Sequence, residues 1–508
     1  MRSTLLLAAA AAVVRATMEV SLTKIQPGQP GLNRRATYVE TLANNITGGG
    51  YYADVLVGTP GQRQRLVVDT GSSDIWVVAY NADLCGSTRL QRYYQDSCST
   101  TCEPGDFAGR RAPADSRTVK PADSSSFKVL LPRRFQIQYL DGSGSAGDYI
   151  TDDFQIGGAT VKNLQMGYAV QTVRGVGIMG VGFSSHEAAE DQYPNIMDEL
   201  TLQGVIQVKA FSLYLNDRRS DAGNLLFGGL DTEKFVGPLS VLPMIRDQQT
   251  GTISTYTVAM NGMSAVFPNG SVYDVPMPAN NVPALLDSGT TLSYIPERMA
   301  VPLFDKLGAY TDTRQTGLTF IDCSFLKVDA GLVITFSFTG GPTISVPVTE
   351  MVLDVFSAFV NLPPGIPFND VCLFGLQSTG SFSSQSQSLA SSNFVLLGDS
   401  FLRSAYVVYD LDHQEIGLAP ANLNSSTSNV VEFKAADSGI PAATGVAAQV
   451  AGNGGGSPTS RGGGTVTVTQ SGNPNAAGPG ARGPGLDVLA VMALAGVFAV
   501  FGGAMVVL

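Results

Sequence analysis

In Leu66-Val67-Val68-Asp69-Thr70-Gly71-Ser72-Ser73, three apolar residues lead into an aspartate, a hydroxyl residue and a glycine. The same order returns in Leu285-Leu286-Asp287-Ser288-Gly289-Thr290-Thr291. Each apolar run predicts a buried β-strand that ends at the aspartate, and the glycine allows a sharp turn and the close approach of another segment. One copy alone is typical of an ordinary strand and turn. Two copies predict two related β-rich lobes that bring Asp69 and Asp287 face to face.

The overall composition favours an all-β extracellular protein. Of 508 residues, 14% are charged and 44% are hydrophobic, and 57 are glycine. This length allows two domains that each have their own core. The formal net charge of −11 argues against nucleic acid as a partner, because phosphate binding needs a basic face. A basic peptide is a more natural ligand.

Histidine chemistry is poorly represented in the sequence. His186 and His413 are the only histidines, and both lie in polar, loop-like sequence that is typical of solvated surface positions. A Ser-His-Asp or Cys-His enzyme would have to use one of them, and neither lies near a GxSxG motif. There is no HExxH motif, no P-loop and no GxGxxG motif that opens a helix. We expect no metal and no cofactor.

The first residues predict export from the cytoplasm. A basic start, an apolar run and Val14-Arg15-Ala16 are typical of a secretory signal over residues 1–16, too short to remain as a membrane anchor. Residues 17–35 end in Arg34-Arg35, which suits a processing protease and predicts a pro-peptide. The alternative is a chance arginine pair in a linker. Three N-glycosylation motifs fit secretion: Asn45, Asn269 and Asn424.

The other end of the chain predicts a stalk and a lipid anchor. Residues 431–486, above all from Ser438 on, are rich in Gly, Ala, Ser, Thr and Pro, which predicts a flexible, O-glycosylated stalk. Residues 487–508 are almost wholly apolar, with no basic residue after them. Small residues around Asn475 precede a Gly/Pro spacer, which is the layout of a glycosylphosphatidylinositol (GPI) attachment signal. Asn475 is the predicted attachment residue, with Gly472 or Asn473 as alternatives to it, and a retained transmembrane helix as the alternative to the anchor.

Five cysteines in a secreted chain indicate disulfides. Cys323 and Cys372 lie in the second half and most simply pair with each other. In the first half Cys85 is expected to pair with Cys98 or Cys102, and the third thiol is left over. A zinc site made by these three is disfavoured, since no histidine lies nearby and the compartment is oxidising.

Segments along most of the chain resemble those of pepsin-type aspartic proteases. The two Asp-containing loops resemble the family's catalytic loops, and the resemblance extends over roughly residues 50–421. The remaining matches occur in the family's order: Tyr51–Pro60 (opening strand and turn), Phe135–Ser143 (flap hairpin), Gly177–Gly180, Phe394–Asp399, and Tyr409-Asp410 through Ala419. In its ends and flap the chain is most similar to the yapsin-like, GPI-anchored proteases of fungi.

The resemblance implies a bilobal all-β fold with the active site between the lobes. The N-terminal lobe is expected over residues 36–238, with a surface insertion at 85–134 that carries two arginine pairs and is either nicked during maturation or left uncut. The C-terminal lobe is expected over residues 239–430. We expect a monomer whose partners are protein or peptide substrates and, through the GPI lipid, the outer face of the membrane or the cell wall.

Two aspartates held close together can hydrolyse a peptide bond without a histidine. Like charges in a poorly solvated site repel, so one pKa rises and the pair shares a proton, as this family is known to do. The charged member activates a water, and the protonated member polarises the carbonyl and later protonates the leaving nitrogen. The titration belongs to the pair, so the two roles are not divided between Asp69 and Asp287. Activity in acid follows as an expectation.

Residues beside the aspartates are expected to support them, by resemblance. Thr70 and Ser288 would brace the two loops against each other through their hydroxyls. Ser72 and Thr290 would hydrogen-bond the outer carboxylate oxygens. A third matched pair would bring backbone amides to the aspartates: Gly71 and Gly289.

The flap hairpin is where the sequence departs from the family pattern. Tyr139 would close over the substrate, with Trp76 beneath it as hydrogen-bond partner or simply as core packing. Leu140 stands where relatives usually have glycine, which puts the geometry of the hairpin in question. Asp141 is hypothesised to pair with Lys or Arg at P1, the substrate residue before the scissile bond; its alternative role is a turn-favouring residue before Gly142.

Two functions other than catalysis are less consistent with the sequence. A non-catalytic pepsin-like binding module would usually lose an aspartate or its glycine, and here both triplets are intact. A structural wall protein would leave the paired motifs, the flap tyrosine and the bracing hydroxyls unexplained. The sequence therefore favours an active aspartic endopeptidase.

Overall fold

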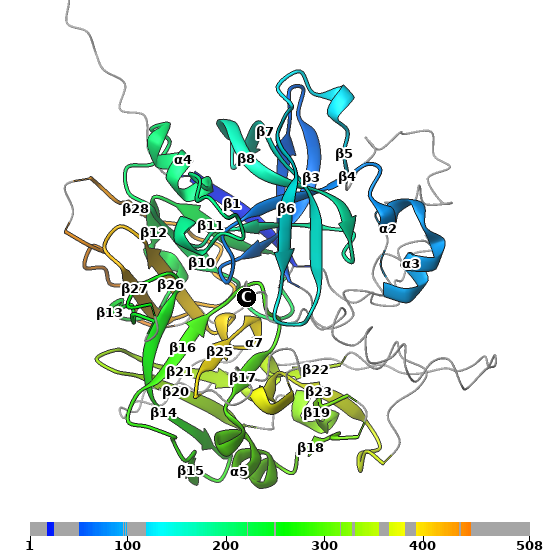
Figure 1. Ribbon diagram of the computed structural model, residues 1–508. Helices are drawn as coiled ribbons and strands as arrows, with labels where there is room; N and C mark the ends of the chain where they lie inside the picture. Colours follow the sequence, from blue (N-terminus) through cyan, green and yellow to red (C-terminus); the bar gives the residue numbers. More distant parts are fainter. Residues whose placement is uncertain are drawn as a thin grey trace, which may run out of the picture.

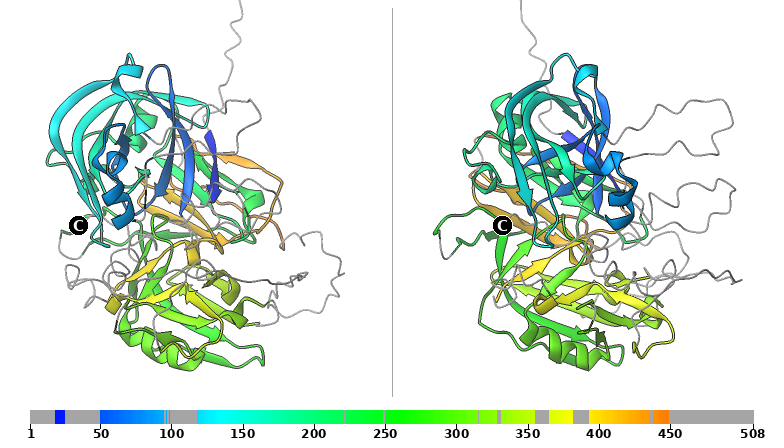
Figure 2. Two further views of the ribbon diagram at one scale, coloured as in Figure 1. Left: turned by 90° about the vertical axis from the view of Figure 1, so that its right-hand side faces the viewer. Right: turned by 45° about the vertical axis from the view of Figure 1, so that its right-hand side comes forward.

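The computed structural model describes residues 18–24, 50–94, 96, 98, 118–220, 222–247, 250–314, 316–327, 331–354, 365–381, 393–435 and 438–448. In Figure 1 the blue-to-teal strands form an upper lobe and the green-to-yellow strands a lower one, and both views of Figure 2 keep this separation. The predicted all-β bilobal fold is confirmed.

The largest sheet has fourteen strands among the described residues. Its order is β13 (Ser240–Pro243), β27 (Glu415–Pro420), β26 (Ala405–Asp410), β10 (Ala210–Tyr214), β11 (Ala222–Phe227), β1 (Met18–Lys24), β2 (Tyr51–Val57), β3 (Gln62–Asp69), β9 (Gly177–Gly180), β4 (Ile75–Ala79), β8 (Ala159–Thr172), β7 (Gly144–Ile156) and β6 (Lys128–Gln138), with β5 (Thr118–Val119) beside β4.

Smaller sheets form the lower lobe and its junction with the upper one. The eight-stranded sheet has the order β21 (Thr343–Pro347), β20 (Val333–Phe338), β14 (Thr257–Val266), β16 (Val282–Leu286), β25 (Val395–Leu397), β17 (Ser293–Ile295) and β24 (Leu376–Ser378), with β15 (Val272–Asp274) beside β14. A four-stranded sheet contains β18 (Tyr310–Thr311), β19 (Thr319–Asp322), β23 (Val371–Phe374) and β22 (Val352–Leu353), and a two-stranded sheet contains β12 (Gly229–Asp231) and β28 (Val430–Glu432).

The α-helices of the described residues are short: α2 (Asp83–Gly86), α3 (Thr88–Tyr94), α4 (Ile196–Leu202), α5 (Glu297–Leu307) and α7 (Asp399–Leu402). Helix α5 shows why one forms. Its apolar residues recur every three or four positions and are buried, Glu297 lies at its positive end and Lys306 at its negative end. It ends at Gly308, whose φ of 69° is left-handed and suits glycine.

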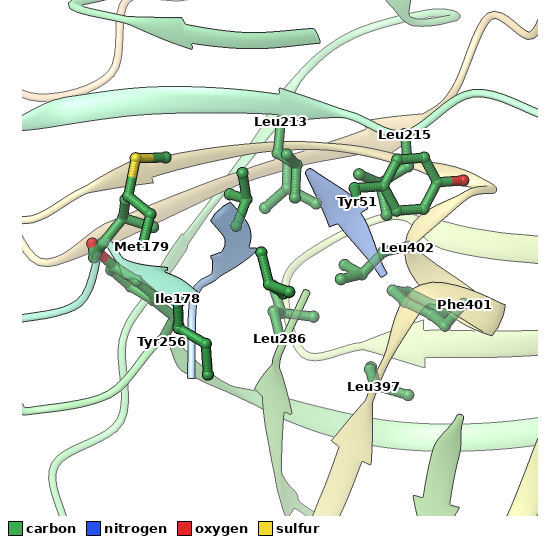
Figure 3. Close-up of a cluster of buried hydrophobic side chains, with 14 of the residues drawn as sticks. Tyr51, Ile178, Met179, Leu213, Leu215, Tyr256, Leu286, Leu397, Phe401 and Leu402 are labelled. Atoms are coloured by element: carbon green, nitrogen blue, oxygen red, sulfur yellow. The ribbon is translucent and has the colours of Figure 1, made fainter. Parts of the chain in front are cut away.

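One apolar core is shared by the two lobes and lies behind the two Asp-containing loops. In Figure 3 Ile178 and Met179 of β9, Leu213 of β10, Leu286 of β16 and Leu397 of β25 gather around it. All five are 0–1% exposed. Burial of each such side chain contributes about 1.5–3 kcal/mol. The strands that end at Asp69 and Asp287 are therefore anchored in common packing.

The expected lobe boundary after residue 238 does not separate the sheets. Strands β26 and β27 fall within residues 239–430, yet they belong to the large sheet, because β10 pairs antiparallel with β26 from Ala210–Asp410 to Tyr214–Tyr406. Both of these strands are buried along their whole length. A strand from the second half of the chain thus extends a sheet of the first half.

Two segment predictions change at their edges. Residues 128–134 were expected in a surface loop but belong to β6. Residues 431–435 and 438–448 were expected in the stalk but pack on the body, with Phe433 2% and Ile440 8% exposed, because apolar residues interrupt the polar sequence there. Residues 18–24 form β1 between β2 and β11, and the pro-peptide over residues 17–35 stays a prediction. The predicted signal peptide and hydrophobic tail lie outside the described residues.

Candidate active site

The two aspartates stand at the ends of equivalent strands. Strand β3 runs parallel to β9 and ends at Asp69, opposite Gly180. Strand β16 runs parallel to β25, and Asp287 follows it and donates its backbone N–H to Leu397 O at 3.0 Å. The duplication in the sequence is thus a duplication in structure, since each carboxylate follows a buried strand with a parallel neighbour.

The two loops are tied to each other by reciprocal hydrogen bonds. Thr70 Oγ1 donates to Leu286 O at 2.8 Å and accepts from Ser288 N at 2.9 Å. In return Ser288 Oγ donates to Val68 O at 2.8 Å and accepts from Thr70 N at 3.2 Å. All of these atoms are buried, and each hydroxyl uses both its donor and an acceptor site. This arrangement leaves little freedom for one carboxylate to move relative to the other.

Each carboxylate has matching partners on its own loop. Asp69 accepts from Gly71 N at 2.8 Å and from Ser72 Oγ. Asp287 accepts from Gly289 N at 2.8 Å and from Thr290 Oγ1 at 2.5 Å.

The aspartates also face each other. A Cβ atom on Gly71 would lie 2.6 Å from Asp287 Oδ1, which is shorter than the contacts that Cβ atoms make with neighbouring atoms in folded proteins. Glycine is needed at this position because the opposite carboxylate occupies the space.

Burial and repulsion control the charge of the pair. Both side chains are 0% exposed. The pKa of Asp69 is raised well above its usual value, mainly by burial and, as the second cause, by the negative charge of Asp287. Burial also raises the pKa of Asp287, while the hydrogen bonds from Thr290 and Gly289 oppose the rise. The arrangement favours one shared proton and one negative charge.

The β6–β7 hairpin carries Tyr139 across this site. Trp76 Nε1 donates to Tyr139 Oη at 2.7 Å, and both side chains are fully buried. The pKa of Tyr139 is raised, mainly by burial and, as the second cause, by the negative charge of Asp69. Figure 1 shows the hairpin reaching from the upper lobe toward the strands of the lower one. The phenol therefore stays neutral and close to the aspartates.

A family model agrees with this geometry. The model described as eukaryotic aspartyl protease matches residues 50–421. The chain belongs to the eukaryotic aspartyl protease family. It is therefore an enzyme of the aspartic-type endopeptidase class, and the resemblance to pepsin-type proteases is confirmed at the level of the family.

Individual relatives of this aspartyl protease are fungal. The "Probable aspartic-type endopeptidase opsB" of Aspergillus oryzae is 35% identical over 401 residues, which cover 78% of this chain and 73% of the relative. The "Secreted aspartic protease 8" of Candida albicans is 32% identical over 396 residues, 78% of this chain and 81% of the relative. The crystal structure of the aspartic proteinase from Irpex lacteus has the same fold, with a TM-score of 0.54, 20% identity and coverage of 81% of this chain and 100% of that one.

Asp141 is in a different environment from the one hypothesised. Its carboxylate forms an ion pair with Arg174, 2.7 Å from the guanidinium, and accepts from Ser143 N at 2.8 Å. The Asp141 side chain is 1% exposed and that of Arg174 is 14% exposed. The protease thus supplies its own cation to the flap aspartate, and a substrate cation would have to compete with it. Sequence reasoning missed Arg174, a single arginine after β8 with no motif around it.

Asp74 is a second residue that sequence reasoning missed. It is fully buried and accepts hydrogen bonds from Tyr193 Oη and from Ala188 N, each at 2.8 Å. Its backbone carbonyl also accepts from Gly180 N at 3.1 Å. Burial raises the pKa of Asp74. These contacts hold the segment after Asp69 against β9. The one available signal was an acidic residue between Ser73 and the apolar run Ile75–Ala79.

The remaining predicted residues lie in both lobes, away from the two aspartates. Disulfides join Cys85 to Cys98 and Cys323 to Cys372, while Cys102 lies outside the described residues. Asn269 and Asn424 are exposed. His413 Nδ1 pairs with Asp410 Oδ2 at 2.8 Å, and His186 is half-buried. Two predicted modification sites lie outside the described residues: Asn45 and Asn475.

Within the described part of the chain, no helix has the length and apolarity needed to cross a bilayer. No group of three or more potential metal ligands occurs in the same residues.

Proposed function

We propose that this protein is a secreted, surface-anchored aspartic endopeptidase in which Asp69 and Asp287 activate a water for attack on a peptide bond. The observation that carries the proposal is the matched support of the two carboxylates. Each accepts one glycine amide and one hydroxyl from its own loop. The loops are also braced directly against each other by Thr70 and Ser288.

The chemistry follows from one proton shared by two buried carboxylates. The ionised member takes a proton from a water as the water oxygen bonds to the carbonyl carbon. The protonated member donates a hydrogen bond to the carbonyl oxygen, and a proton then passes to the nitrogen as the C–N bond breaks. Because the amides and hydroxyls are already in place, little reorganisation is needed when charge develops. The reaction requires no covalent intermediate, and the full site lies within one chain.

We expect peptide cleavage that is fastest in acid and is blocked by a peptide carrying a hydroxyl-bearing, uncleavable isostere at the scissile bond. The raised pKa of Asp69 keeps the shared proton bound at pH values where an exposed aspartate, with a pKa of about 3.9, has lost it. As the pH rises through the raised pKa, that proton leaves and kcat/KM falls.

The measurement is kcat/KM on a peptide library between about pH 3 and pH 8. Equal rates at about pH 4 and pH 8 would contradict the shared proton. Binding of the isostere peptide without any cleavage would favour the non-catalytic binding module instead.

A preference for Lys or Arg at P1 remains a prediction, and Arg174 sharpens its test. If a substrate cation replaces Arg174 beside Asp141, Arg174→Gln frees the carboxylate and raises kcat/KM for lysine peptides over leucine peptides by about fivefold, as expected for an ion pair of about 1 kcal/mol. Asp141→Thr should lower the same ratio. A ratio that neither variant changes shows that Asp141 serves only the hairpin.

The location outside the cell is proposed from the chain ends. Residues 1–16 and 17–35 suit a signal and a pro-peptide, and residues 487–508 with Asn475 suit a GPI signal in the manner of the yapsin-like proteases. Relatives named as secreted aspartic proteases support export. Release of the protein from intact cells by a phosphatidylinositol-specific phospholipase would support the anchor, and retention after this treatment would count against it.

A further inference from the structure

Leu140, at the tip of the flap hairpin, packs into the opposite lobe. It is 2% exposed and belongs to a cluster of buried apolar residues in which every other described member comes from the second half of the chain. The other buried members are Leu285, Leu292, Tyr294, Leu318, Phe320, Leu353, Val371, Leu373 and Leu396. One side chain of the first lobe thus completes an apolar cluster of the second.

This cluster lies beside the catalytic carboxylate. Leu285 is two residues before Asp287, and Leu292 is five residues after it. Burial raises the pKa of Tyr294, a member of the cluster, and the negative charge of Asp141, next to Leu140, raises it further. On the other side of the tip, Tyr139 accepts a hydrogen bond from Trp76 of the first lobe. The tip therefore contacts both lobes.

Burial of a leucine at this point favours the closed hairpin. Transfer of a leucine side chain out of water contributes about 1.5–3 kcal/mol. The ion pair between Asp141 and Arg174 holds the neighbouring residue in the same closed conformation. A peptide that passes between the hairpin and the loops must lift the tip, and this takes Leu140 out of its cluster.

We propose that Leu140 is a specificity-determining plug, which fills the apolar site of the second lobe that a substrate's own apolar side chain occupies when the hairpin lifts. The inference rests on the proposed endopeptidase function. It follows that a leucine, methionine or phenylalanine at one position near the scissile bond restores the lost contact. A charged residue at that position leaves the cluster open or must itself be desolvated.

The test compares Leu140→Ala with the wild-type enzyme for inhibition by the uncleavable isostere peptide and for cleavage of a matched peptide. Loss of the plug removes the contact that the peptide has to displace, so we expect Ki and KM to fall by about tenfold or more, with kcat not reduced in proportion. A merely structural role predicts the opposite sign, because a loosened hairpin holds the peptide less well.

Two variants and one optical signal make the result interpretable. Leu140→Met keeps the apolar volume and should resemble wild type, and Leu131→Ala removes an exposed leucine (43% exposed) from β6, the strand that leads into the tip, and should change neither constant. Trp76 is the only tryptophan in the chain and is hydrogen-bonded to Tyr139 of the hairpin, so its fluorescence reports opening of the hairpin. Free Leu140→Ala should already show part of the emission change that the isostere peptide causes in wild type.

The outcomes distinguish a failure of the proposed endopeptidase function from a failure of the Leu140 plug. If the wild-type enzyme cleaves no peptide, the proposed function is wrong. If it cleaves peptides but Leu140→Ala binds the isostere peptide no better than wild type, or shows the wild-type emission before the peptide is added, the plug is wrong and the endopeptidase stands. Wild-type cleavage without any preference for an apolar residue at any position near the scissile bond also overturns the plug.

Discussion

Asp69→Asn is expected to lower kcat/KM by about 10²–10⁴-fold, the range by which general acid–base catalysis accelerates reactions. Asparagine has nearly the same shape, and its side-chain oxygen can still accept the hydrogen bond from Gly71 N. It cannot ionise, however, so the pair no longer combines a base with an acid. Asp287→Asn should lose activity to a similar degree, since the proton is shared and neither residue holds one role alone.

The double variant distinguishes a shared proton from two independent contributions. Residues that act as a unit show effects that do not add, so Asp69→Asn with Asp287→Asn should be little slower than either single variant. The measurement is kcat/KM near the acid optimum, with retained folding checked by circular dichroism. Asp54→Asn is the matched control, because that carboxylate is 54% exposed in the middle of β2 and pairs with Arg65 rather than with either Asp-containing loop. Multiplied losses in the double variant would contradict the shared proton.

The aspartates and their braces could be predicted because the information is local. Asp69 to Ser72 and Asp287 to Thr290 each lie within four consecutive residues, and the hydrogen bonds that support a carboxylate link positions two or three apart. Repetition of such a motif is rare by chance, so the pairing of the two loops followed from the duplication itself.

The ion pair at the flap could not be predicted from the sequence in the same way. Asp141 and Arg174 are 33 positions apart, and Arg174 lies in no motif. Their contact depends on how the turn of the β6–β7 hairpin meets the end of β8. The packing of Leu140 into the second lobe depends on even more distant neighbours. Sequence pattern marked this tip as unusual, whereas only the fold shows what its side chains contact.

The predicted boundaries of two segments differ from the structure for a related reason. The stalk was expected from residue 431 because the sequence there is mostly polar and small, yet Phe433 and Ile440 are buried and β28 pairs with β12, and together these contacts hold the chain on the body. The large sheet crosses the expected boundary at residue 238 because β26 pairs with β10, and the sequence of a strand that is buried along its whole length does not reveal which partner it has.

Glu350→Gln is expected to destabilise the fold by about 3 kcal/mol, the low end of the range for one partner lost from a buried ion pair. Arg403 is 0% exposed, and its Nε donates to Glu350 Oε2 at 2.9 Å. Without the carboxylate, the guanidinium keeps its charge in a dry site. The loss falls at the low end because the charge of Asp399 also acts on Arg403 and because glutamine still offers an acceptor.

This destabilisation should appear as a lower urea midpoint with an unchanged m-value. Asp54→Asn serves again as the control, since it breaks the exposed pair with Arg65 and should change the free energy of unfolding by no more than about 1 kcal/mol. The pair of substitutions Glu350→Gln and Arg403→Met removes both charges and should recover part of the loss. If Glu350→Gln alone matched the exposed control, Asp399 rather than Glu350 would be the main counter-charge of Arg403. The tie between helix α7, which follows β25, and the segment before β22 would then not depend on Glu350.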